Sequence, residues 1–260
     1  MDLNLTDENY YSNEANSRYW SVSQFKAFDK CEACGLAESQ GLYERPETDA
    51  LLIGSYVDAY FSGEFERFQE ERGSQMFKRG GELLQKFQHA NDMINAIECQ
   101  PACVEFLEGE KQTIMSANLF NVDWKIKMDI YNEQRIVDLK TIKDFGDIYD
   151  PDYGWRDWVS FWKYDLQGAI YTRVEQKVTG RKEPLPFYLL AVTKEKVPDV
   201  KLIHIPDEVL QTALEMVKAK IGRYQLIKQG DVEPIRCEHC DYCKSTKIIL
   251  TPETYQVKED

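Results

Sequence analysis

A change in the spacing of apolar residues near position 112 is the feature of this sequence that most constrains its fold. Before that position, apolar residues recur at helical intervals in three runs, at 21–41, 50–68 and 77–107. After it, three short segments carry alternating or β-branched residues, at 113–120, 124–131 and 135–142. The chain therefore joins a helical first part to a sheet.

The second half of the sequence adds helices and strands to this sheet. A helical pattern at 158–178 is followed by two apolar strand candidates at 186–193 and 200–205, and then by a helix at 207–228. The order of elements predicts an α/β (α+β) fold, in which helices pack on the faces of a central mixed β-sheet. The segment 143–156 contains glycine and proline, and we expect a surface loop there.

The length of 260 residues and the hydrophobic content of 43% fit one large domain. We divide it into a helical N-terminal part (1–110), an α/β core (111–230) and a Cys-containing C-terminal segment (231–260). No apolar run reaches the roughly 18 to 20 residues that span a bilayer, and the first residues are acidic and polar. We therefore expect a cytoplasmic protein without a membrane partner.

The formal net charge of −13 argues against a nucleic-acid partner, because surfaces that bind DNA are normally basic. The charge is unevenly distributed. Residues 1–75 hold 15 acidic and 6 basic side chains, a net of −9, which leaves 30 acidic and 26 basic side chains, a net of −4, for the remainder. A carboxylate-rich metal site also adds negative charge that bound cations would offset. The charge lowers the expectation of DNA binding without excluding it.

Two acidic residues and a lysine on the second and third predicted strands are spaced so that their side chains can lie close together. Asp138 and Lys140 are two residues apart, so on a strand they face the same side. Pairing of the hairpin can bring Asp129 opposite them. Aspartates supply hard oxygen ligands for Mg²⁺ or Mn²⁺, while a lysine ammonium can orient or activate an attacking water and stabilise charge on a phosphate.

The alternative for these three residues is a solvated hairpin with ordinary surface charges. The flanking residues favour a functional site instead. Ile136 and Val137 lead directly into Asp138, and Leu139 is expected to point into the core. The acid therefore lies at the end of a buried strand rather than on an open polar face.

Taken together, the motifs of this chain resemble the PD-(D/E)xK nucleases, and among them phage and prophage exonucleases similar to exodeoxyribonuclease VIII and the RecB-type nuclease domain. The resemblance covers about residues 21–247 and implies a restriction-endonuclease-like catalytic core in a single nuclease domain. It depends on four motifs in a fixed order: Ser21-Val-Ser-Gln-Phe-Lys, Leu52-Ile-Gly-Ser-Tyr-Val-Asp58, Asp129 with Asp138-Leu-Lys140-Thr, and Gln167-Gly-Ala-Ile-Tyr171.

The resemblance implies roles for further residues. The family's early helix commonly supplies a histidine as a metal ligand, and this chain has Asp58 there, an oxygen ligand suited to Mg²⁺. Gln167 and Tyr171 share a helical face, as does the family's Q-x-x-x-Y signature that lines the cleft. The implied catalytic set is Asp129, Asp138, Lys140, Gln167 and Tyr171, and the implied metal ligands are Asp58, Asp129, Asp138 and the Leu139 backbone carbonyl.

Asp58, Gln167 and Tyr171 could each have a structural role instead of a functional one. Asp58 can be a polar residue on the exposed side of its helix. Gln167 and Tyr171 can belong to a face of their helix that packs against the sheet and happens to carry two polar groups.

The seven cysteines occur in clusters, and Cys237, Cys240 and Cys243 place three thiols within seven residues. In a chain without a secretion signal, such spacing favours a metal site or reduced thiols over disulfides. Some RecB-type nucleases hold an iron–sulfur cluster with one cysteine before the core and three after it, and the resemblance makes Cys31 the fourth candidate. The last of the three is more distant in those nucleases. A zinc site that uses His239 and free thiols are the alternatives.

The leading interpretation is a metal-dependent DNA exonuclease that hydrolyses phosphodiester bonds with Mg²⁺ or Mn²⁺. The resemblance implies linear double-stranded DNA ends as substrate and phage-type recombination or DNA processing as the setting. It also implies a single-strand annealing protein as partner and a homo-oligomer. Two other classes stay open: a nuclease-like fold kept as a non-catalytic DNA-end-binding or structural module, and an Fe–S or zinc interaction protein.

Overall fold

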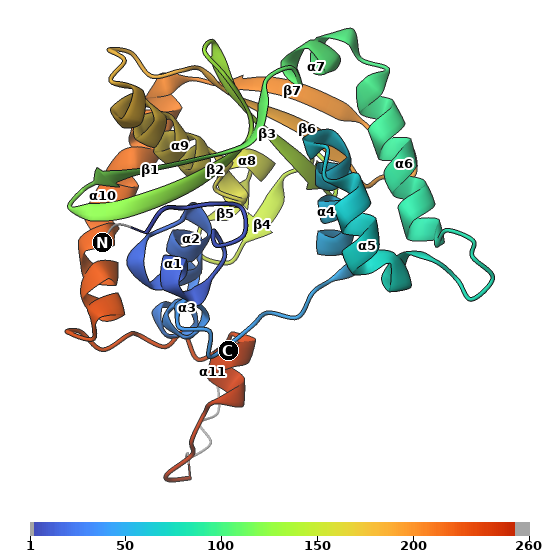
Figure 1. Ribbon diagram of the computed structural model, residues 1–260. Helices are drawn as coiled ribbons and strands as arrows, with labels where there is room; N and C mark the ends of the chain where they lie inside the picture. Colours follow the sequence, from blue (N-terminus) through green and yellow to red (C-terminus); the bar gives the residue numbers. More distant parts are fainter. Residues whose placement is uncertain (1–2, 253–260) are drawn as a thin grey trace.

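A five-stranded sheet in the order β1-β2-β3-β6-β7 is the centre of the computed structural model, which describes residues 3–252 (Figure 1). β3 and β6 are parallel, and the other neighbouring strands are antiparallel. The strands are β1 (Glu110–Leu119), β2 (Val122–Asn132), β3 (Arg135–Ile142), β6 (Phe187–Thr193) and β7 (Val200–Ile205). A mixed sheet flanked by helices confirms the fold class expected from the sequence.

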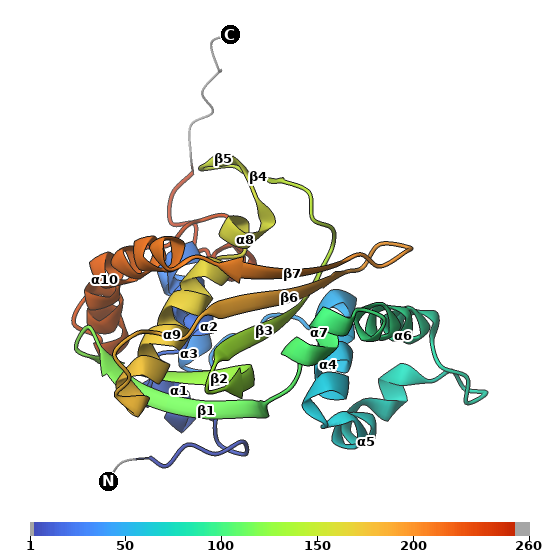
Figure 2. The ribbon, with the colours of Figure 1, turned by 90° about the horizontal axis from the view of Figure 1, so that it is seen from above.

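Helices cover both faces of this sheet (Figure 2). Those of the first part are α1 (Asn13–Arg18), α2 (Val22–Lys30), α3 (Glu32–Ser39), α4 (Asp49–Ser62), α5 (Phe65–Met76), α6 (Gln85–Glu98) and α7 (Pro101–Phe106). Those of the second part are α8 (Trp158–Phe161), α9 (Tyr164–Thr179), α10 (Asp207–Gln229) and α11 (Asp241–Ser245). Because α9 carries the chain between β3 and β6, those two strands can run parallel.

Each face of the sheet packs into its own apolar core. Side chains of α2, α9 and α10 pack with one face of the sheet, on which Ile136 of β3 lies. Side chains of α4 and α6 pack with the other face, on which Val137 and Leu139 lie. β3 is therefore buried on both sides, as expected for a strand with a parallel neighbour. Its side chains at 138 and 140 share the face of Ile136, toward α2 and α9.

The helices are more interrupted than the apolar spacing predicts. The run expected at 21–41 is two helices that meet at Cys31, which has extended backbone angles (φ −163°, ψ 112°). The run expected at 50–68 ends at Gly63, whose φ of 80° is in the left-handed region. The helix expected at 158–178 is broken before α9 by Lys163, with φ 54°. These three boundaries correct the predicted ones.

The segment 143–156, expected to be a loop, contains a short antiparallel hairpin, β4 (Ile148–Asp150) with β5 (Gly154–Arg156). Figure 2 shows it projecting away from the sheet. Between residues 3 and 252 no helix is both long and apolar enough to cross a membrane. The division of the chain at 110 and 230 stays a prediction, and residues 253–260 of the proposed last segment lie outside the described residues.

Candidate active site

The point at which β2 and β3 stop pairing creates an opening in the sheet. The two strands pair at three positions, from Asn132↔Arg135 to Ile130↔Val137. Beyond them the Leu139 N–H donates to Asp129 Oδ2 at 2.8 Å, in place of a backbone acceptor on β2. The N–H and C=O of one strand residue point to the same side, so the Leu139 carbonyl faces this opening as well.

Asp138 and Lys140 lie on one face of β3, where a side chain from α9 meets them. Lys140 Nζ lies 2.5 Å from Asp138 Oδ2 and 4.0 Å from Asp129 Oδ2. Gln167 Nε2 donates to Asp138 Oδ1 at 2.7 Å. The Asp138 side chain is 1% exposed. The sheet and α9 together hold this carboxylate in one orientation.

Burial of these charged groups alters their ionisation. Burial and the nearby Asp138 raise the pKa of the Asp129 carboxyl well above its ordinary value. Burial acts to lower the pKa of Lys140, but the two aspartates outweigh it and raise that pKa. Asp138 Oδ2 is buried and makes no well-aligned hydrogen bond within the described chain, although the Lys140 ammonium is close. A further cation would stabilise this arrangement.

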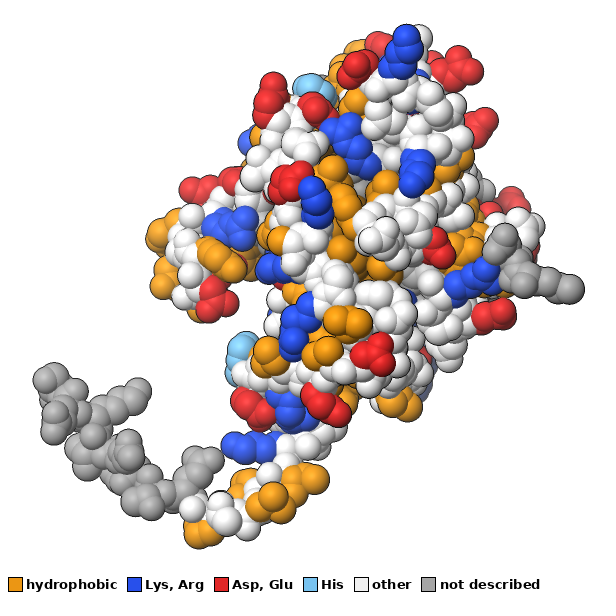
Figure 3. Space-filling view, turned by 90° about the vertical axis from the view of Figure 1, so that its left-hand side faces the viewer, with side chains coloured by type: hydrophobic (Ala, Val, Ile, Leu, Met, Phe, Trp, Pro, Cys, Tyr) orange, Lys and Arg blue, Asp and Glu red, His pale blue; other side chains and the backbone are white. Residues whose placement is uncertain are grey.

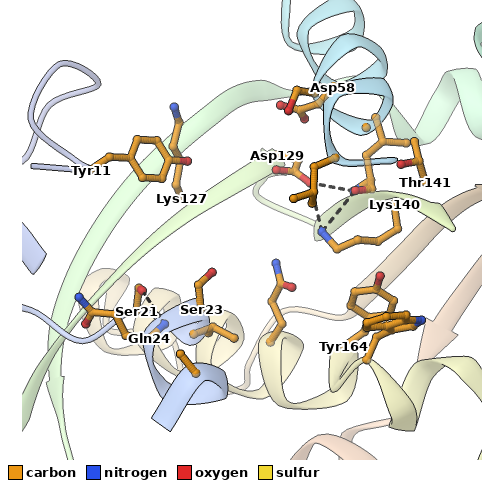
Figure 4. Close-up of a pocket in the computed structure, with 18 of the residues that line it drawn as sticks. Tyr11, Ser21, Ser23, Gln24, Asp58, Lys127, Asp129, Lys140, Thr141 and Tyr164 are labelled. Carbon is orange, nitrogen blue, oxygen red and sulfur yellow. Dashed lines mark hydrogen bonds and ion pairs between the residues drawn. The ribbon is translucent and has the colours of Figure 1, made fainter. Parts of the chain in front are cut away.

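A cavity of about 1050 Å³ opens in front of these residues (Figure 4). Asp129, Leu139 and Lys140 line it, together with Gln167 and Tyr171 of α9. Residues of α2 and α3 form another part of its wall, and residues of α4 form a third. Segments that are far apart in the sequence therefore meet at one cavity.

Asp58, on α4, also lines this cavity, and Figure 4 shows it beside Asp129. Burial raises the pKa of Asp58, and the charge of Lys140 opposes that shift. Gln112 Nε2 donates to Asp58 Oδ1 at 3.5 Å. No hydrogen bond joins Asp58 to Asp129 or Asp138 within residues 3–252. The fold thus brings Asp58 to the cavity but leaves it outside the contacts that join Asp129, Asp138 and Lys140.

Tyr171 lies on the same face of α9 as Gln167 and is 9% exposed. Burial raises the pKa of Tyr171 well above its ordinary value, so the side chain is a neutral phenol at physiological pH. A neutral phenol can donate a hydrogen bond into the cavity.

Two further cavity residues were not singled out from the sequence. Lys127 is two residues before Asp129 on β2, and its Nζ lies 2.9 Å from Asp7 Oδ1. The spacing argument that grouped Asp138 with Lys140 could also have found it. Tyr164 begins α9, and its ring centroid lies 5.6 Å from Lys140 Nζ. No pattern in the sequence marks Tyr164, because the break before α9 that positions it was not predicted.

Four cysteines form a second cluster at the junction of α2 and α3. The sulfur atoms of Cys31, Cys237, Cys240 and Cys243 all lie within 4.8 Å of one another. These four sulfur atoms are close enough together for all of them to bind one ion. His239 is outside the group, and its Nδ1 lies 2.6 Å from the Cys237 carbonyl oxygen.

Comparisons with known proteins agree with the fold. Residues 21–246 match the family described as a PDDEXK-like domain of unknown function (DUF3799). A solved structure of a protein from Eubacterium rectale, provisionally named an exonuclease, is 40% identical, with 97% of each chain covered and a TM-score of 0.92. A structure of SSO0001 is 15% identical, with 85% of this chain and 93% of that chain covered, but its TM-score of 0.27 is too low for any argument. No curated protein matches the chain.

The family match covers most of the chain and includes the Asp129, Asp138 and Lys140 positions. The high structural similarity extends over nearly the whole chain as well. This protein therefore belongs to the PDDEXK-like family DUF3799 and to the PD-(D/E)xK nuclease superfamily.

Proposed function

We propose that this protein is a divalent-metal-dependent deoxyribonuclease that degrades linear double-stranded DNA from its ends. The observation that carries the proposal is the arrangement at the cavity. A buried carboxylate, Asp138, is held between Lys140 and Gln167, while Asp129 and the Leu139 carbonyl face the same opening. Family membership and the name of the Eubacterium rectale protein support a nuclease, and that name also supports exonuclease action.

The donor atoms at the cavity suit Mg²⁺ or Mn²⁺. Carboxylate and carbonyl oxygens are the hard ligands that these ions prefer. Asp138 Oδ2 has no well-aligned hydrogen-bond partner in the described chain, and the raised pKa of Asp129 indicates that its negative charge is poorly compensated. Asp129, Asp138 and the Leu139 carbonyl would hold the ion, with Asp58 as a further ligand.

Each residue has a distinct task in hydrolysis of a phosphodiester. A bound divalent ion supplies positive charge against the charge that develops on the phosphate oxygens. Lys140, which stays protonated because its pKa is raised, donates to the attacking water or to a phosphate oxygen. Gln167 fixes the Asp138 carboxylate, and the Leu139 N–H fixes that of Asp129. Tyr171 can donate to the substrate from the same face of α9.

The cavity is more basic than the chain as a whole. Five lysines and three acidic residues line it: Lys125, Lys127, Lys140, Lys143 and Lys194, against Glu38, Asp58 and Asp129. Elsewhere, acidic and basic side chains are mixed on the surface that Figure 3 shows. A local concentration of lysines can bind phosphates although the chain carries a net charge of −13, because the potential at a cleft depends on nearby charges.

A nuclease assay with end-labelled linear duplex tests the proposal. The parent protein should release label with Mg²⁺ or Mn²⁺ and not with excess chelator, and it should leave covalently closed circles intact. Lys140→Ala should lose at least about a hundredfold in rate, because it removes a preorganised cation from the reacting phosphate. Asp123→Asn is a matched control, since Asp123 is an exposed acid on β2 that bonds to Asn118.

Cleavage of closed circles would contradict the exonuclease part of the proposal. Metal-independent cleavage, or full activity of Lys140→Ala, would contradict the site. Binding of DNA ends without any hydrolysis would favour the non-catalytic DNA-end-binding module. A role in phage-type recombination, an annealing partner and a homo-oligomer belong to the same proposal through the resemblance to exodeoxyribonuclease VIII-like proteins.

A further inference from the structure

The distances in the cysteine cluster match those around a single tetrahedral ion. Cys243 Sγ lies 3.6 Å from Cys31 Sγ and 3.9 Å from Cys237 Sγ, and all four sulfur atoms lie within 4.8 Å of one another. A zinc ion binds thiolates at roughly 2.3 Å, so the sulfurs of a regular tetrahedral site are about 3.8 Å apart. The four thiols are thus already near the positions that one ion requires.

An iron–sulfur cluster does not fit this spacing. In a four-iron cluster each cysteine binds a different iron, and in a two-iron cluster the cysteines are divided between two irons. Thiolates on different irons are separated by the width of the cluster, and must lie farther apart than thiolates that share one metal. The structure therefore disagrees with the cluster that the resemblance to some RecB-type nucleases implies.

The backbone around the cysteines supports bound thiolates. The Cys240 N–H donates to Cys237 Sγ at 3.3 Å, and the Cys243 N–H donates to Cys240 Sγ at 3.4 Å. Such bonds stabilise the negative charge of a thiolate. Arg236 adds a positive charge nearby, with its Nη2 2.6 Å from the Cys243 carbonyl oxygen.

We propose that Cys31, Cys237, Cys240 and Cys243 form a mononuclear tetrathiolate site that holds one structural Zn²⁺. The soft thiolate donors suit zinc and differ from the oxygen donors of the cavity. A fully protein-coordinated zinc has no open position for substrate, so this site acts on the structure and not on the reaction.

The zinc would join the C-terminal segment to the wall of the cavity. Cys31 is the residue at which α2 ends and α3 begins, and both helices contribute cavity residues. Two hydrogen bonds lie next to the cluster: the Ala33 N–H donates to the Ile235 carbonyl at 3.2 Å, and the Ile235 N–H donates to the Glu32 side-chain Oε2 at 2.7 Å. The ion would close a loop of more than 200 residues and so contribute to folding.

Elemental analysis of the full-length protein, purified without added metal, tests this proposal directly. We expect about one zinc per chain and a colourless solution. Replacement of zinc by Co²⁺ should give the intense visible and near-ultraviolet bands of tetrahedral cobalt thiolate. Protein that contains iron, with the broad visible absorption of a cluster, would overturn the proposal. Protein without bound metal that also fails to take up Zn²⁺ or Co²⁺ would overturn it as well.

Single substitutions test which side chains bind the zinc. Cys240→Ser should lose the metal and melt at a lower temperature. Cys34→Ser should keep it, because Cys34 is a neighbouring buried cysteine whose thiol bonds to Glu38 instead. His239→Ala should also keep zinc. If Cys240→Ser does not fold, the zinc content and cobalt spectrum of the parent still decide. Retention of zinc by folded Cys240→Ser would contradict the ligand assignment.

The zinc proposal and the nuclease proposal can fail separately. Asp138→Asn should keep one zinc per chain while it loses cleavage, because Asp138 is bonded to Gln167 and is not one of the four zinc ligands. An inactive parent protein with one zinc would contradict only the nuclease proposal. An active parent protein without zinc would contradict only the zinc proposal.

Discussion

Asp138 is the residue on which the candidate active site depends. Its side chain is 1% exposed, yet its neighbours provide one cation, Lys140, and one amide, Gln167. Asp129 shares the same lysine at a longer distance and receives the Leu139 N–H. Two buried acids thus share the positive charge of one lysine. This arrangement lowers the free energy of unfolding unless another cation binds.

Neutral substitutions at these acids should separate function from folding. Asp129→Asn and Asp138→Asn should each abolish metal-dependent cleavage, whereas their melting temperatures without metal should hold or rise. Asparagine keeps the shape and removes a poorly compensated charge. Addition of Mn²⁺ should raise the melting temperature of the parent, since an ion that binds only the folded state stabilises it. The same addition should have little effect on the variants.

Differential scanning fluorimetry with and without Mn²⁺ makes this measurement, with Asp123→Asn as the control that behaves like the parent. More than a trace of Mg²⁺-dependent cleavage by either variant would remove that residue from the site.

Substitution of Asp58 tests whether this residue is a ligand of the metal ion. If it is a ligand, Asp58→Ala should weaken Mn²⁺ binding by about tenfold or more and change DNA affinity less. Calorimetric titration of Mn²⁺ into the parent and the variant, beside a DNA titration of each, makes the comparison. Unchanged Mn²⁺ affinity would place Asp58 outside the metal shell.

Part of the candidate site could be predicted from residue spacing alone. A separation of two on β3 fixes the common face of Asp138 and Lys140, whatever the rest of the chain does. The bond from Leu139 to Asp129 could not be predicted, because it depends on where β2 and β3 stop pairing. The roles of all these residues in catalysis stay predictions.

At the scale of elements, α9 is the helix that positions the site. It contributes Gln167 and Tyr171 to the cavity, and its other side packs on β6 and α10. Gly168 permits this packing: a Cβ there would lie 2.4 Å from the Phe187 ring and 2.9 Å from Leu210. The close approach of the helix to the sheet therefore depends on a residue without a side chain.

Two glycine-to-alanine substitutions should have opposite effects on stability. Gly168→Ala should destabilise the protein by about 1–3 kcal/mol, because the ring of Phe187 must move. Gly222→Ala, on α10 with open space around its Cβ, should stabilise it by about 0.5–1 kcal/mol through helix propensity. Urea denaturation of both variants makes the comparison. Equal stabilities would show that α9 does not pack this closely on β6.

The strands could be predicted closely, but the helix breaks could not. The segments of β6 and β7 are both short apolar runs between turn-forming residues, and they begin and end within one residue of their predicted positions. A break leaves the apolar spacing on both sides almost unchanged. Phe25, Phe28 and Leu36 therefore suggest one helix although the chain turns at Cys31. Cys243, from the distant end of the chain, meets Cys31 at this turn, a contact that the apolar spacing does not reveal.

At the scale of the whole molecule, the distribution of charge determines how an acidic protein can bind DNA. The net charge is −13, yet the cavity gathers five lysines. The Debye length at physiological ionic strength is about 8 Å, so distant acids are largely screened while lysines at the cleft are not. We therefore expect DNA binding to depend strongly on salt.

The salt dependence can be assigned to single lysines. Lys143 lines the cavity and its side chain is 95% exposed, so Lys143→Ala should reduce the slope of log affinity against log salt by about 1. Lys218 on α10 lies 3.6 Å from Glu215, much as Lys143 lies 3.4 Å from Asp144, but it does not line the cavity, so Lys218→Ala should leave the slope unchanged. Fluorescence anisotropy with labelled duplex, in the non-cleaving Asp138→Asn background, gives both slopes. Equal slopes for the two variants would argue against this cavity as the DNA site.

An anomalous-scattering map of a crystal soaked in Mn²⁺ shows whether Asp129 and Asp138 bind a metal ion, because it locates the ion without an assay. We expect a manganese peak at about 2.2 Å from carboxylate oxygens of Asp129 and Asp138 and from the Leu139 carbonyl oxygen. Occupancy should be lost in Asp138→Asn crystals treated in the same way. A protein that cleaves DNA with Mn²⁺ but binds the ion elsewhere, with no peak between Asp129 and Asp138, would contradict the proposed site.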